Sequence, residues 1–454
     1  MSETATATIW DRYRLGVTLG AVALIFLAAL ESLAVTTVMP VVSAALDGEA
    51  LFAVAFAGTL ATSVIGMVAA GAWSDARGPR GALYAAVTLF LLGLVISGLA
   101  TNMYVFLIGR LVQGLGTGGQ TVALYVVVAR LYPAQLHGRV FAAFAAAWVV
   151  PSMIGPFLAG AVAEFLHWRW AFLGVAVLTA IAFATVAIRL RGVDLGGGEG
   201  GMGRAVWQRL GLASVVAAGA VVVGFSADLD DLRLGWVIAA VAIVVIAVAV
   251  RPLLPPGTLR ARPGLPSVVL LRGIVAAAFF AGEAYVPNLL MNRFAFTPTW
   301  AGISLMLAAL AWAGASAVQG RYGDRLGNLR IALIGTALVA AALLAVPLTV
   351  LLGWSPLVIV LLWTCAGAGM GLLYPRLTVL TLAYSHERDQ GFNSSALSIS
   401  DSGGSAVFIA VVGLAFASLG GEGGAYVLAF GMCIGLLVVG LIPSGRLGHG
   451  AERV

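Results

Sequence analysis

The first candidates for chemistry are ionisable side chains inside the long apolar stretches of this chain, where an uncompensated charge is costly to keep in lipid. Glu31, Arg110, Glu283 and Asp401 lie well within their stretches, and Arg272 lies near the start of one. A carboxylate in such surroundings can bind and release a proton as its neighbours change, and an arginine can pair with it. The first four are our candidates for proton coupling and for lining a central cavity. Arg272 is expected to extend its charge toward the membrane surface.

Glu31 and Arg110 are predicted to face one cavity in the N-terminal half and to interact there. On this hypothesis Glu31 titrates in response to burial, to Arg110 and to substrate, so that proton and substrate compete for one site. The alternative is a static buried ion pair that only fixes helix packing. Replacing Glu31 with glutamine distinguishes the two, because only the first predicts loss of proton-coupled transport.

Glu283 and Asp401 are the candidates in the C-terminal half. Glu283 lies 41 residues before Asp324, much as Glu31 lies 44 residues before Asp75, so each half carries an acid in its first apolar stretch. Asp401 lies in the serine-rich run SALSISDSGGSA at 395–406. That run either lines the cavity or forms a patch of small residues that lets helices approach closely.

The elements that must position these residues are transmembrane helices. The chain has 454 residues, of which 61% are hydrophobic and only 10% charged, whereas soluble proteins carry about 25% charged residues. Fourteen apolar stretches approach or exceed the roughly 20 residues that cross a bilayer. They are 15–40, 50–73, 81–100, 103–129, 138–165, 168–190, 208–227, 233–251, 267–292, 298–319, 329–352, 355–382, 391–418 and 423–443. We expect an all-α membrane protein with fourteen spans.

The arginines predict the orientation of these spans. The chain has no lysine, and 25 arginines contribute to its net charge of +6. With the N-terminus inside, only Arg169, Arg233 and Arg293 fall outside, while Arg110 and Arg272 lie within spans. Both termini are therefore expected to be cytoplasmic. The positive charge is explained by this bias, so no nucleic-acid partner is expected. The composition, rich in alanine, glycine and arginine, favours a bacterial inner membrane.

An internal repeat divides the chain. The segment GAWSDARGPR at 71–80 recurs as GRYGDRLGNLR at 320–330 with one constant offset of 249. The matching residues are Gly71, Asp75 and Gly78 in the first copy and Gly320, Asp324 and Gly327 in the second. Parallel six-helix repeats are a known transporter architecture. We predict a six-helix bundle at 1–191, a linker with a two-helix insert at 192–264, and a second six-helix bundle at 265–454.

The repeated segments are predicted to be cytoplasmic gating loops. Glycine allows helices to approach closely at a tight turn, and a carboxylate beside arginines can form charge pairs that open and close. The expected pairs join Asp75 to Arg77 and Arg80, and Asp324 to Arg325 and Arg330. The alternative is that these are ordinary cytoplasmic loops whose arginines only follow the positive-inside bias.

Four motifs resemble those of one transporter family. GAWSDARGPR resembles the loop signature of the major facilitator superfamily, and GRLVQGLGTGGQ at 109–120 is similar to its fourth-helix motif. PSMIGPFLAG at 151–160 is similar to the fifth-helix antiporter signature through Gly155, Pro156 and Gly160, but departs from it at Pro151 and Ala159, where the family usually has glycine. ESLAVTTVMP at 31–40 resembles the first-helix motif of fourteen-helix drug:proton antiporters, with glutamate in place of aspartate.

The resemblance implies two bundles that rock about a central site and export small hydrophobic compounds against an inward flow of protons. It also implies a bend at Gly155 and Pro156 that limits leak, although membrane helices tolerate prolines for other reasons. Similar fourteen-helix proteins move lipids or glycolipids, so a lipid exporter is the alternative. The cargo, protons and membrane lipid are the expected partners, and we expect a monomer.

The sequence does not support an interpretation as an enzyme or as a cofactor-binding protein. The residues Gly114, Gly116 and Gly119 spell a dinucleotide-binding pattern, but that pattern needs a preceding strand, and here helix packing explains it. No phosphate loop, metal-ligand spacing or nucleophile triad is present. We therefore expect no enzyme activity and no cofactor, with the proton gradient as the energy source.

Overall fold

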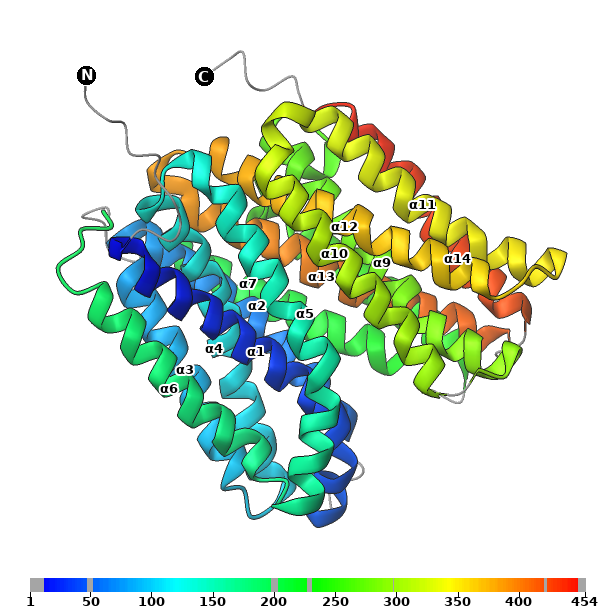
Figure 1. Ribbon diagram of the computed structural model, residues 1–454, viewed down its shortest axis with the longest axis horizontal. Helices are drawn as coiled ribbons and strands as arrows, with labels where there is room; N and C mark the ends of the chain where they lie inside the picture. Colours follow the sequence, from blue (N-terminus) through cyan, green and yellow to red (C-terminus); the bar gives the residue numbers. More distant parts are fainter. Residues whose placement is uncertain are drawn as a thin grey trace.

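The computed structural model describes residues 12–46, 52–196, 203–226, 231–296, 298–419 and 423–447. In these ranges the chain is helical almost throughout (Figure 1). The first eight long helices are α1 (Arg12–Ala45), α2 (Phe52–Arg77), α3 (Pro79–Gly98), α4 (Met103–Leu131), α5 (Ala134–Phe165), α6 (Trp170–Arg189), α7 (Arg204–Phe225) and α8 (Leu232–Ala249). The remaining six are α9 (Leu265–Phe294), α10 (Pro298–Leu326), α11 (Asn328–Leu352), α12 (Leu357–Ala383), α13 (Gln390–Ser418) and α14 (Gly423–Ser444).

Each helix coincides with one predicted stretch. Within the described residues, twelve of the fourteen are long and apolar enough to cross a membrane. The other two, α2 and α5, contain positions whose side chains are not described. An all-helical membrane fold is therefore confirmed, and the count of fourteen spans stays a prediction.

The helices form two groups and a pair between them. Helices α1–α6 pack mainly on one another, with α4 between α2 and α3, and α9–α14 do the same, with α12 between α10 and α11. Helix α7 packs against α8, against α2 of the first group and against α13 of the second. The two-helix insert thus contacts both groups, and three single-turn 3-10 helices, η3 (Arg251–Leu253), η4 (Thr258–Arg260) and η5 (Glu387–Asp389), lie in connections.

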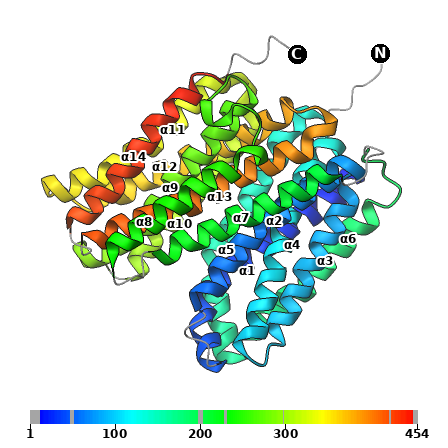
Figure 2. The ribbon, with the colours of Figure 1, turned by 180° about the vertical axis from the view of Figure 1, so that it is seen from behind.

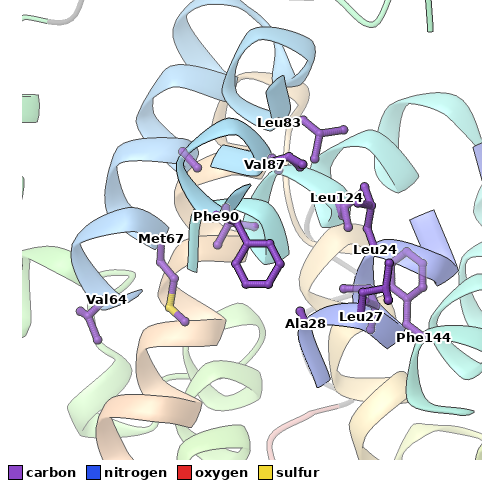
Figure 3. Packing of buried hydrophobic residues seen from close by; sticks show 14 of the residues in the cluster. Leu24, Leu27, Ala28, Val64, Met67, Leu83, Val87, Phe90, Leu124 and Phe144 are labelled. Atoms are coloured by element: carbon purple, nitrogen blue, oxygen red, sulfur yellow. The ribbon is translucent and has the colours of Figure 1, made fainter. Parts of the chain in front are cut away.

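Each group has its own apolar core. In the first, Phe90 is fully buried, and Figure 3 shows it beside Met67 of α2, with Leu24 of α1 and Leu124 of α4 close by. In the second, the ring of Phe279 stacks on Trp363 with centroids 5.3 Å apart. Helices in lipid associate through such close packing rather than through exclusion of water, so each group is held together by its own core.

The predicted gating loops are mostly helical, which corrects the loop assignment. Helix α2 continues to Arg77 and α3 begins at Pro79, so only Gly78 lies between them, and Gly327 alone separates α10 from α11. Both glycines have the same conformation, with φ of 84° and 79°. Only glycine adopts such a conformation readily. The repeat therefore encodes a one-residue turn, and its aspartates lie on helices.

We call the end that carries these two turns the motif end. Here the two groups touch: a Cβ at Gly71 of α2 would lie 2.5 Å from the carbonyl oxygen of Gly391 in α13, and one at Gly320 of α10 would lie 3.1 Å from that of Gly138 in α5. We call these α2–α13 and α5–α10 contacts the seam. Away from the motif end the two groups diverge (Figures 1 and 2). The structure is therefore closed at the motif end.

Candidate functional site

The predicted ion pair between Glu31 and Arg110 is present. Arg110 Nη1 donates to Glu31 Oε1 and, at 2.9 Å, to Gln113 Oε1. Glu31 and Arg110 are each only 4% exposed. Arg110 Nε and Gln113 Nε2 are buried and have no hydrogen-bond partner among the described residues. An unsatisfied buried donor costs about 1–3 kcal/mol, so this pair has the capacity to bind a further acceptor.

Close helix packing sets the depth of this pair. Arg110 and Gln113 lie on α4, and a Cβ at Gly93 of α3 would meet the backbone nitrogen of Gln113 at 2.4 Å. On the other side, a Cβ at Gly114 would meet the Thr59 carbonyl oxygen of α2 at 2.3 Å. Helices α2, α3 and α4 therefore approach too closely for side chains at these points, which brings the polar face of α4 against α1. The glycine pattern serves packing here, as the sequence indicated.

A second ion pair in the other group was missed by the sequence reasoning. Arg272 of α9 is 5% exposed, and its Nη2 lies 2.8 Å from Asp401 Oδ2 on α13. Its guanidinium lies 3.4 Å from the ring centroid of Tyr374, and the Tyr374 hydroxyl donates to Asp401 Oδ1 at 2.9 Å. The expectation that Arg272 reaches the membrane surface is wrong. Asp401 could have indicated this ion pair in the sequence, because a buried arginine needs a carboxylate partner.

This second pair lies close to the first group. Arg272 Nη1 also donates to the Tyr374 carbonyl oxygen at 2.9 Å, which ties α9 to α12. The phenol of Tyr125, on α4, is near enough to interact electrostatically with both Arg272 and Asp401. Asp401 is therefore neither a plain packing position nor a free cavity carboxylate. It belongs to a charged cluster that faces the other group.

Glu283 has a different setting from the other candidates. It is half-buried on α9, and no ion pair or hydrogen bond of its carboxylate is found among the described residues. It lies eleven residues, or about three helical turns, beyond Arg272 on the same face. Phe280, one turn before it, packs against Trp312 and Tyr374 with centroids 6.3 and 6.4 Å apart. The predicted symmetry with Glu31 holds for position on the first helix, but not for the ion pair.

Asp75 of α2 forms hydrogen bonds with α13 across the seam. Its Oδ1 accepts the Gly391 amide at 2.6 Å and its Oδ2 accepts the Phe392 amide at 2.8 Å, at the start of α13. Asp75 lies beyond the predicted span 50–73. Burial raises the pKa of its carboxyl from 3.8 to about 6, the two amides and the charge of Arg130 lower it, and the nearby charge of Asp389 raises it. These two hydrogen bonds link the first group to the second across the seam.

The predicted charge pairs of Asp75 with Arg77 and Arg80 are wrong. Residues two apart on a helix point in different directions, and Arg77 is exposed while Asp75 turns toward α13. Arg80 donates instead to the Leu190 carbonyl oxygen at 3.4 Å. Within the described chain, the positive charge near Asp75 comes from Arg130, whose Nη2 also donates to the Glu387 carbonyl oxygen across the seam at 3.1 Å.

Asp324 does not repeat this arrangement. It is 85% exposed and pairs at 2.7 Å with Arg376 of α12, which also donates to Asn328 at 2.7 Å. The predicted pairs with Arg325 and Arg330 are wrong, because α12 presents the arginine that faces this turn. Since α10 and α12 are in the same group, the second copy of the motif holds its own bundle together.

The antiporter-like stretch lies in α5. Gly155 is buried, and a Cβ there would meet Leu30 and Leu33 of α1 at 3.5 and 3.6 Å. The surroundings of Pro156 and Gly160 are not described, so the expected bend stays a prediction. Among the residues that are described, no group of three or more His, Cys, Asp or Glu side chains could hold a metal ion.

Comparison with known proteins decides the family. The model of the Major Facilitator Superfamily matches residues 21–409. The chain belongs to the major facilitator superfamily. Members and structural neighbours of this family are transporters rather than enzymes, so a transport protein is the coarse functional assignment.

Relatives and solved structures agree with this assignment. The chain is 27% identical over 406 residues to a probable multidrug-efflux transporter of Mycobacterium tuberculosis (strain CDC 1551 / Oshkosh), covering 84% of this chain and 83% of that protein. It is 26% identical over 425 residues to the MFS transporter L2 of Phoma sp. (strain ATCC 20986 / MF5453), covering 87% and 68%. Matches to the first four curated relatives span between 25% and 68% of their lengths.

The fold is shared with structures of low identity. The human organic anion transporter MFSD10 superposes with a TM-score of 0.68 at 16% identity, covering 96% of this chain and 100% of that one. A bacterial homologue of the iron transporter ferroportin, in its outward-facing state, gives 0.70 at 10% identity, covering 95% and 99%. Likeness at such low identity establishes the fold and does not identify the cargo.

Proposed function

We propose that this protein is a proton-coupled antiporter that exports small hydrophobic compounds by alternating access. The observation that carries the proposal is the buried Glu31–Arg110 pair, with unsatisfied donors beside it. Ionisable groups at such depth are expensive and mark ion or substrate pathways in transporters. The relative named as a probable multidrug-efflux transporter supports export of drug-like compounds.

The predicted orientation determines which side of the membrane the closed motif end faces. With both termini cytoplasmic, the motif end faces the cytoplasm of a bacterial cell and the closed seam blocks access from that side. The groups diverge toward the outside, so this is the outward-facing state, ready to release cargo and to take up a proton. The fourteen-span topology and the inner-membrane location belong to this proposal.

Glu31 and Arg110 couple the two flows. When a proton from outside binds Glu31, the carboxylate becomes neutral and its attraction for Arg110 weakens. The site then differs between its protonated and unprotonated states, which is the requirement for shifting a two-state equilibrium. After the seam opens inward, cargo binding favours release of the proton, and the cycle returns. Arg272, Asp401 and Glu283 line the opposite side of the same pathway.

The test measures coupled and uncoupled movement separately. Purified protein is reconstituted in liposomes with an inward pH gradient, and lipophilic cations, antibiotics and fluorescent lipids are offered as cargo. Glu31→Gln is compared with Glu387→Gln, the same change at an exposed carboxylate. We expect Glu31→Gln to lose gradient-driven flux but to keep cargo exchange without a gradient, and Glu387→Gln to keep both. Unchanged gradient-driven flux in Glu31→Gln would refute the coupling role, and flux confined to lipids would identify a lipid exporter instead.

A further inference from the structure

Arg209 lies on the insert helix α7, next to the α2–α13 part of the seam. Its guanidinium lies 4.5 Å from the ring centroid of Phe392, the residue whose amide is bound by Asp75. A small enclosed space beside Arg209 is lined by residues of three other elements: Val68 and Ala72 of α2, Leu253 of η3, and Phe392 and Ser395 of α13. Arg209 is therefore placed where the insert, the first group and the second group meet.

Arg209 also lines a second, larger hollow. Its volume is about 510 Å³, and it is lined by Gln208, Arg209, Gly211, Leu212 and Pro252. Arg209 is half-buried, and no carboxylate lies within ion-pair distance of it in the part of the chain that the structure describes. Among the described residues, the positive charge of Arg209 in this hollow thus has no acidic partner.

The geometry of Arg209 leaves its hydrogen-bond donors available. Stacking on Phe392 uses the flat face of the guanidinium, whereas its N–H groups point outward from the edge. That edge matches the paired oxygens of a phosphate, which arginine binds with two parallel hydrogen bonds. Gln208 adds an amide, and Leu212 and Pro252 give the hollow apolar walls.

The height of the hollow indicates the source of the phosphate. Arg209 lies near the start of α7, and the neighbouring Trp207 is 65% exposed. Tryptophans at such positions are typical of the boundary between headgroups and acyl chains, and basic pockets between helices on the cytoplasmic side bind lipid headgroups. With the predicted orientation, this boundary belongs to the inner leaflet.

We propose that this hollow binds the phosphate of an anionic phospholipid from the inner leaflet, and that the bound lipid stabilises the closed seam. The phosphate holds the edge of Arg209 while its face remains on Phe392. Opening the motif end separates α2 from α13, and α7 packs against both. The lipid therefore favours the state in which Arg209 and Phe392 stay together. Neither statement depends on the cargo or on proton coupling.

The test compares variants in nanodiscs of phosphatidylcholine with and without phosphatidylglycerol. Binding of phosphatidylglycerol is measured by native mass spectrometry, and closure of the seam by spin-label distances across it, with no cargo or gradient present. We expect Arg209→Gln to weaken lipid binding by about five-fold or more and to abolish the lipid-dependent closure. Arg204→Gln, at an exposed arginine one and a half turns earlier, should retain both.

A second variant keeps Arg209 intact. No atom lies within 4 Å of a Cβ built at Gly211, which lines the hollow. Gly211→Phe is therefore expected to fill the hollow without strain and to block the lipid while the protein keeps its thermal stability. Lipid binding that is unchanged in both Arg209→Gln and Gly211→Phe would overturn the proposal. Equal closure with soluble glycerophosphate would also overturn it, because the site would then take free phosphate.

Discussion

Acid is expected to close the seam through Asp75. In the closed arrangement burial against α13 raises the pKa of this carboxyl to about 6, against a usual value of 3.8. When the seam opens, water reaches the carboxylate and its pKa returns toward that usual value. The closed arrangement therefore binds the proton more tightly, so lowering the pH favours closure. The gain is largest below both pKa values and is lost as the pH rises through about 6.

The size of this effect follows from the two pKa values. Near pH 7 the carboxyl is mostly charged in both arrangements, so the proton contributes little. Near pH 5 it is mostly protonated when closed and mostly charged when open. The ratio of closed to open molecules should therefore rise by up to about ten-fold between these two conditions. Solvent around the half-buried carboxylate makes this an upper value.

The assay is a distance distribution across the motif end. Spin labels are attached at residues 77 of α2 and 325 of α10, both exposed and in different groups, in a variant without the native cysteines. The short-distance population should grow as the pH falls. Asp75→Asn should remove this dependence, whereas Asp324→Asn, the matching change in the second copy of the motif, should leave it intact. A pH response that survives in Asp75→Asn, or that opens the seam in acid, would refute the reasoning.

Two further predictions concern stability, measured by thermal unfolding in detergent. Removing one partner of the buried Arg272–Asp401 pair, as in Asp401→Asn, should lower the free energy of unfolding by about 3–5 kcal/mol. The double change Arg272→Met with Asp401→Leu should recover most of this loss. A double variant that is no more stable than Asp401→Asn would contradict a simple ion pair. Gly118→Ala should cost about 1–3 kcal/mol, because its Cβ would lie 1.9 Å from the Ser63 carbonyl oxygen. Gly174→Ala, with no atom within 4 Å of the new Cβ, should be neutral, and equal losses at the two sites would show that close packing is not the cause.

The sequence predicted the helices and one of the two ion pairs. Apolar length alone located every helix, because lipid requires each span to satisfy its own backbone. Glu31 and Arg110 could be paired since each is a lone charge in its stretch. The partner of Asp401 was missed because Arg272 lies near a helix end, where a long side chain usually reaches water. Packing of α9 against α12 and α13, which no local pattern encodes, keeps it inside.

The contacts of the repeated motif could not be predicted either. Its residues suggested local charge pairs, but a helix directs Asp75 away from Arg77 and toward a distant part of the chain. Nothing near residue 75 indicates that amides at 391 and 392 complete its hydrogen bonds. Likewise, Arg376 lies 52 residues from Asp324. Such partners depend on how the helices pack. The motif therefore predicts the turn between two helices, but not the residues that its aspartate contacts.

The unequal use of the two motif copies makes the seam an asymmetric hinge. At its α2–α13 edge the Asp75 carboxyl group is buried against α13, and burial raises its pKa to about 6, so protonation of Asp75 stabilises this edge. Its α5–α10 edge rests on the close approach of Gly138 and Gly320, two residues with nothing to titrate. Protonation of Asp75 therefore acts on the α2–α13 edge. When the motif end opens, the two bundles should separate at the α2–α13 edge and rotate about the contact between Gly138 and Gly320.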